Sequence, residues 1–262
     1  FGKIQMNRFF LTGVALLLII LIILILGSNF FTIKKIDVKS EKVACANDNQ
    51  LKDSAGLLGQ NFFLINVENT AKKLTEKFIC IKNITFIRIP PKNVRLQVFG
   101  REAQAILVVL KSQEAASHIE EVATPSAEEE ADSFLVDSEG VIFSKDIMGY
   151  NIPRIYFYDK NISLGNKLDK LLRKSLKILD KIRTFGLDIK DTRVLNDLFL
   201  IYPQMSLPKI IFRMDDKIDI QLTSLQLILE KTKMDNKELE FIDLRFDKPF
   251  VKFAPKKGDG GR

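Results

Sequence analysis

The chain has 262 residues, of which 46% are apolar, and its formal net charge is +7. This apolar content excludes global disorder, and the length allows one large or two small domains. The basic residues are spread along the chain without a nucleic-acid motif, so we expect no nucleic acid among the partners.

The N-terminal region contains a long uncharged stretch. No charged residue occurs between Arg8 and Lys34, and the segment FFLTGVALLLIILIILIL at residues 9–26 approaches the roughly 20 residues that cross a bilayer core. We therefore expect a transmembrane helix at residues 9–30, after a short tail at residues 1–8. A cleaved secretory signal is the alternative, disfavoured because the apolar run exceeds the usual ~7 to 15 residues. The flanking lysines do not by themselves favour a cytoplasmic N-terminus.

Residues 31–110 have the pattern of a small domain. Alternation predicts a strand at residues 31–39, and helical spacing predicts helices at residues 50–58 and 67–78, the second capped by Asn66. Two strands follow on either side of Pro90 and Pro91. This order of strand, helix, helix, strand and strand is similar to a POTRA domain, in which two helices cover one face of a three-stranded sheet.

Cys45 and Cys80 are the two cysteines of the chain. They form no CxxC motif and have no histidine nearby, so we expect no metal site. In an oxidising compartment they would pair, and the closed loop would add about 3 kcal/mol of stability. Two unpaired buried thiols are the alternative, and the sequence leaves both open.

Residues 111–132 differ abruptly in composition, being rich in Ala, Glu and Ser. We interpret them as an acidic linker or flexible loop. The single histidine, His118, lies in this segment, where a lone residue in low-complexity sequence is a bystander rather than a base or a ligand.

A second domain is expected at residues 133–255, followed by a polar tail at residues 256–262. The segment SFLVDSEGVIF predicts a hairpin that turns at Gly140, and further strands are expected at residues 154–158, 198–202, 210–213 and 218–222. The helical spacing of leucines predicts a helix at residues 168–185, ended by Gly186, and another is expected at residues 224–233. The overall expectation is an α+β protein whose second domain is mixed α/β and dominated by an antiparallel sheet.

The helix at residues 168–185 has a basic face opposite its leucines. Its members are Lys170, Arg173, Lys174, Lys177 and Lys181. Anionic lipid or an acidic polymer would suit such a face, but an ordinary solvated face is the better interpretation.

The order of these features resembles that of one bacterial family. An apolar helix, a POTRA-like unit, the hairpin FLVDSEGVIF and the terminal segment FIDLRFDKPFVKFAP occur in the order and spacing of the FtsQ/DivIB cell-division family, over essentially the whole ordered chain. The segment IDLRF is the most distinctive part. The chain departs from the family at GREAQA, where Gly100 and Ala103 replace the usual acidic residue and proline, and in its longer acidic insert.

The resemblance implies a single-pass inner-membrane protein with a cytoplasmic N-terminus and extracytoplasmic domains, enriched at the division site. It implies a scaffold without catalysis and without a cofactor, which binds FtsB-like and FtsL-like division proteins through the C-terminal domain and contacts the lipid bilayer through its anchor.

The terminal segment carries the expected partner-binding site. Alternation places Ile242, Leu244 and Phe246 on one face, with Asp243 and Arg245 on the other. The last strand has no later element to pair with, and an open edge of this kind accepts a strand from a partner. The candidate binding residues are Arg245, Phe246, Phe250, Val251, Lys252 and Phe253. In the alternative interpretation, Asp243 and Arg245 satisfy each other and Phe253 packs internally.

Two other functional classes remain as alternatives. A scaffold for secretion or translocation would share the POTRA domain but would not need IDLRF. A membrane-tethered cell-wall hydrolase would need paired carboxylates or a nucleophile in a recognisable motif, and the chain shows none. We therefore expect no catalytic residue.

Overall fold

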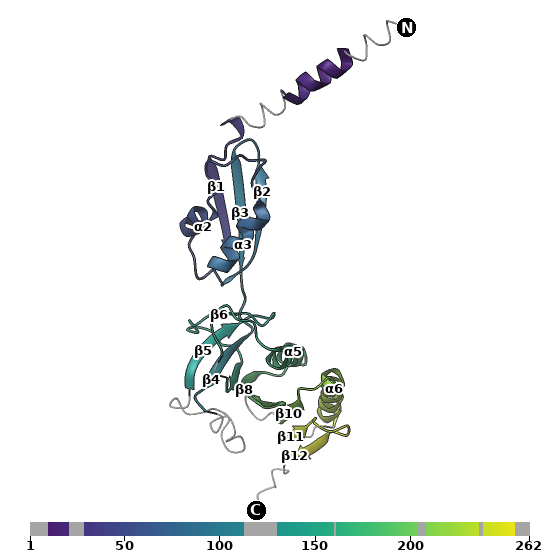
Figure 1. Cartoon of the computed structure of the whole chain (residues 1–262). Helices are drawn as coiled ribbons and strands as arrows, with labels where there is room; N and C mark the ends of the chain where they lie inside the picture. The colour runs from purple at the N-terminus through teal and green to yellow at the C-terminus, as the bar shows by residue number, and fades with distance from the viewer. Residues whose placement is uncertain are drawn as a thin grey trace, which may run out of the picture. The chain divides into compact units, whose positions relative to one another are not determined.

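The computed structural model describes residues 10–20, 29–112, 130–159, 161–203, 208–235 and 238–254. The chain divides into two compact units, Phe1–Arg101 and Glu102–Arg262. Both combine helices with a sheet, so the fold is α+β (Figure 1).

The expected transmembrane helix at residues 9–30 is wrong. Residues 10–20 are helical. Across the described ranges, the structure contains no helix with the length and apolar character needed to cross a bilayer. The single-pass inner-membrane localisation rested on that helix and is wrong for the same reason.

The first unit contains a three-stranded sheet and two helices. Its elements are η1 (Asn29–Phe31), β1 (Lys35–Glu41), α2 (Asp48–Ala55), α3 (Val67–Lys77), β2 (Ile81–Ile89) and β3 (Asn93–Gly100). The strand order is β1-β3-β2, with β1 parallel to β3 and β2 antiparallel to it. Val94, Leu96 and Val98 alternate along β3 and are buried, so the central strand supplies the core of this unit.

Local capping residues fix both helices of the first unit. The side chain of Asn47 accepts a hydrogen bond from the Gln50 backbone N–H, and the Gln50 side chain accepts one from the Asn47 N–H, which completes a capping box. Asn66 caps α3 by accepting from the Asn69 N–H at 2.9 Å.

A disulfide joins Cys45 to Cys80, with 6.0 Å between their Cα atoms. It connects the β1–α2 loop to the residue that precedes β2. Of the two states that the sequence left open, the structure contains the bonded one.

The second unit is built on one nine-stranded sheet. Its strands are β4 (Ala105–Leu110), β5 (Glu130–Val136), β6 (Ile142–Ser144), β7 (Arg154–Phe157), β8 (Ile189–Leu195), β9 (Leu198–Pro203), β10 (Lys209–Arg213), β11 (Leu239–Asp243) and β12 (Phe250–Phe253). Its helices are α5 (Lys170–Thr184) and α6 (Ile218–Met234). The strand order is β12-β11-β10-β9-β8-β7-β4-β5-β6.

This sheet is mixed. β7 runs parallel to β4 and to β8, and α5 lies in the connection between β7 and β8. β10 and β11 are also parallel, with α6 in their connection, whereas the remaining neighbouring pairs are antiparallel.

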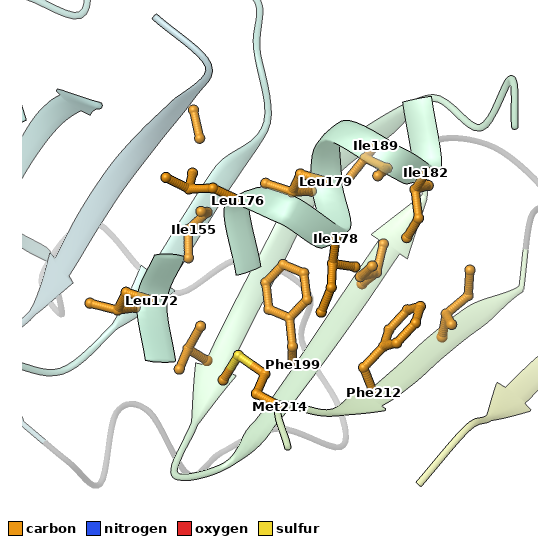
Figure 2. Packing of buried hydrophobic residues seen from close by; sticks show 14 of the residues in the cluster. Ile155, Leu172, Leu176, Ile178, Leu179, Ile182, Ile189, Phe199, Phe212 and Met214 are labelled. Carbon is orange, nitrogen blue, oxygen red and sulfur yellow. The ribbon is translucent and has the colours of Figure 1, made fainter. Parts of the chain in front are cut away.

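The core of the second unit lies between the helices and one face of the sheet. Ile178 and Ile182 of α5 point toward Phe199 and Phe212 of the strands, and Leu176 lies beside Ile155 of β7 (Figure 2). Burial of a large apolar side chain contributes about 1.5–3 kcal/mol, so this layer fixes where α5, α6 and the C-terminal strands lie.

Two expected elements differ in the structure. The run Ala105–Leu110 was assigned to the first domain, which was expected to end at residue 110, but it forms β4 of the second unit. Residues 218–222, expected as a strand, form the first turns of α6, because Ile218, Leu222 and Leu225 are buried at helical spacing. The expected linker at residues 111–132 and the tail at residues 256–262 lie mostly or wholly outside the described residues.

Candidate partner-binding edge

β12, the last of the described strands, forms one end of the nine-stranded sheet. β12 pairs antiparallel with β11, placing Asp243 opposite Phe250 and Ile242 opposite Val251. Among the described strands, β11 is its one neighbour (Figure 1). Alternate backbone N–H and C=O groups of an edge strand point away from the sheet, so β12 offers a row of hydrogen-bonding groups for one further strand.

The turn between β11 and β12 is held by Asp243 and Arg245. Arg245 Nε donates to Asp243 Oδ1 at 2.9 Å, and Arg245 Nη2 donates to Asp243 Oδ2 at 2.6 Å. The Arg245 backbone N–H also donates to Oδ1 at 3.0 Å. The carboxylate therefore fixes both the backbone of the turn and the direction of the guanidinium group.

This contact shifts the pKa of both groups. Burial pushes the pKa of the Asp243 carboxyl upward, but the hydrogen bonds and the charge of Arg245 outweigh burial and hold that pKa below its ordinary value. The hydrogen bond to Asp243 raises the pKa of Arg245 further. Both groups are charged at neutral pH, and Arg245 remains partly exposed beside the Phe246 ring, 5.5 Å from its centroid.

Aromatic side chains stand exposed along this edge. Phe246 is 60% exposed and Phe250 is 57% exposed, and Phe253 is exposed as well. The Phe250 ring leans on Phe241 of β11, with centroids 6.4 Å apart. Aromatic residues of this kind are typical anchors at protein interfaces.

The other two candidate residues have internal roles. Val251 packs against the core of the unit. Lys252 donates to Glu240 of the neighbouring strand at 2.7 Å, in an exposed ion pair.

A cavity of about 300 Å³ opens beside the β11–β12 turn. Ile220 and Gln221 of α6 line one side, and Arg245, Phe246 and Asp247 line the other. Lys217 also lines the cavity and forms an ion pair with Asp247 at 2.9 Å. The cavity mixes apolar and charged walls, as a pocket for one partner side chain does.

The predicted site residues are thus distributed over two places. Arg245 and Phe246 lie on the turn beside the cavity, whereas Phe250 and Phe253 lie on β12. The alternation that placed Phe246 with Ile242 and Leu244 fails, because the strand ends at Asp243 and Phe246 turns outward. Ile220 was not predicted as a cavity residue, since its segment was expected to be a strand.

The basic face of α5 is partly neutralised within the unit. Lys174 donates to the Asp215 carbonyl at 2.7 Å and to Asp216 at 3.1 Å, and Lys177 donates to Asp219 at 2.8 Å. These contacts connect α5 to the start of α6, and they favour an ordinary structural role for the face. His118 lies outside the described residues, and no group of metal ligands occurs among the residues that are described.

The chain matches no protein-family model and no curated protein sequence.

Proposed function

We propose that the chain is a scaffold of the bacterial division machinery that acts without catalysis and binds FtsB-like and FtsL-like proteins at the β12 edge. The order of its segments and the IDLRF motif support the family, and the open edge supports the mode of binding. The observation that carries the proposal is an edge strand with an exposed Phe250, directly after a turn that fixes Arg245.

Binding would proceed by strand addition. Main-chain hydrogen bonds to β12 supply affinity that depends little on the partner's sequence, and side chains select the partner. Phe250 provides an apolar anchor, and the exposed part of Arg245 favours an acidic partner residue near the turn. Because Asp243 already orients the guanidinium group, little side-chain entropy is lost on binding.

The test is a binding titration of the full chain with FtsB-type and FtsL-type ectodomains. Phe250→Glu places a charge at the anchor, and we expect it to weaken binding at least ~30-fold, the equivalent of about 2 kcal/mol. Met148→Glu, at another exposed apolar residue of the same unit, is the control and should bind as the unaltered chain does. Both variants should keep the thermal midpoint. Equal binding by the Phe250→Glu variant would refute the edge as the binding surface.

A further inference from the structure

The outer side of α6 carries a line of exposed apolar side chains. Ile220 is 65% exposed, Leu227 is 61% exposed and Met234 is 80% exposed. Ile218, Leu222 and Leu225 lie on the opposite side of the helix and are buried. The buried side of α6 belongs to the core of the second unit, and the outer line lies outside that core.

The spacing of this line is seven residues. Seven residues complete almost two turns, so successive members drift by only about 20° around the helix axis. Single exposed apolar residues are common on protein surfaces. Three residues at this spacing lie along one side of the helix and form a seam, which a second helix lying alongside can contact.

Charges of opposite sign flank the seam. Viewed along the helix axis, Glu230 lies about 60° to one side of Leu227, and Lys231 lies about 40° to the other side. The two charges therefore lie on opposite sides of the seam. Glu230 accepts a hydrogen bond from Gln226 on its own helix. Thr223 and Ser224, one turn earlier, are small and allow close approach.

The charges beside the seam match those of a second copy when the two helices are parallel. When two identical parallel helices are related by a twofold axis, each flank faces the opposite flank of the other copy, so Glu230 meets Lys231 of the second copy. In an antiparallel pair, like flanks meet and both Glu230 side chains lie on the same side. The charges therefore favour a parallel pair of the same chain.

We propose that α6 is a self-association surface on which two copies of the chain pair in parallel and in register. Ile220, Leu227 and Met234 each stack on their counterparts, and two Glu230–Lys231 pairs form across the seam. Phe246, exposed and lining the same cavity as Ile220, extends the apolar surface at one end. The seam is one helix of about 25 Å, so the dimer is weak and depends on protein concentration.

This inference is independent of the proposed function. None of the seam residues belongs to β12, and strand addition is not needed for α6 to pair. The two proposals can therefore fail separately: partner binding tests the edge, and the oligomeric state tests the seam.

Cysteine cross-linking of the full chain tests the seam directly. Leu227→Cys and Ile220→Cys are made separately, with Gln226→Cys on the side of the helix as the matched control. The native cysteines are already joined to each other and do not compete. In a parallel in-register dimer each seam residue lies opposite its own copy, so mild oxidation should cross-link both seam variants and leave the Gln226→Cys variant monomeric.

Charge reversal provides a second measurement by sedimentation. Glu230→Lys should weaken dimerisation about tenfold, and the double variant Glu230→Lys/Lys231→Glu should restore it. Both residues are exposed, so folding should be unaffected. Equal cross-linking at Gln226→Cys, cross-linking at only one seam position, or association that ignores both charge variants would overturn the proposal.

Discussion

Asp243 and Arg245 show how a two-residue contact shapes the candidate site. The Asp243 carboxylate is buried and accepts three kinds of donor from Arg245: the backbone N–H, Nε and Nη2. From the sequence alone, an internal contact between these two residues is the alternative to a partner contact. The structure contains the pair, and Arg245 is still partly exposed, so the internal contact positions the arginine without hiding it.

Removing the arginine should expose the dependence of Asp243 on it. In an Arg245→Ala variant the buried carboxylate loses its counter-charge, and we expect the free energy of unfolding to fall by about 2–3 kcal/mol. Lys252→Ala is the matched control, because its ion pair with Glu240 is exposed and is worth under ~1 kcal/mol. Urea denaturation at pH 7 measures both. Similar losses in the two variants would contradict the role given to Arg245.

The depressed pKa of Asp243 predicts a dependence of stability on pH. A carboxyl whose folded pKa is lowered stabilises the fold above its unfolded pKa of about 3.9, and this contribution disappears as the pH falls through the lower folded value. An Asp243→Asn variant should therefore lose less stability than the unaltered chain as the pH falls from about 5 to about 2. Unfolding followed by circular dichroism across that range checks it, and parallel curves would contradict it.

At the scale of elements, the C-terminal part of β3 depends on close backbone approach. A Cβ atom at Gly100 would collide with the backbone carbonyl of Lys42 in the loop after β1. Backbone cannot move aside as a flexible side chain does, so Gly100→Ala should lower the free energy of unfolding by about 1–3 kcal/mol. Thermal unfolding of the variant measures the effect, and an unchanged midpoint would show that the Lys42 loop is free to move.

The sequence predicted those elements that carry their own local signals. Asn66 was predicted as the cap of α3 and does cap it, and Gly186 follows the end of α5 with a positive φ, as expected. Ala105–Leu110 carries no alternation because β4 is buried on both faces, so nothing local showed which sheet it joins. Residues 218–222 alternate like a strand, and only packing against the core makes them helical.

The candidate site was predictable in part for the same reason. The hairpin and its place at the end of the chain follow from the sequence of residues 241–255. The outward direction of Phe246 and the cavity beside Ile220 depend on α6. The alternating residues 218–222 predicted a strand, so the start of this helix was not predicted.

At the scale of the whole molecule, the chain consists of two units with separate cores, one of which contains the disulfide. Replacing both Cys45 and Cys80 by Ala removes a crosslink between residues 35 apart and should cost the first unit about 3 kcal/mol. Because the cores are separate, calorimetry should show one transition lowered and the other unchanged. Equal lowering of both would contradict independent units.

The proposed function requires that β12 accept a strand from a division partner. Hydrogen exchange of the β12 backbone amides, with and without an FtsB-type ectodomain, tests it most directly, because strand addition covers the outward N–H groups. Exchange in residues 250–253 should slow on binding, while exchange in β6, at the opposite end of the sheet, should stay the same. Saturating binding that leaves β12 exchange unchanged would contradict it.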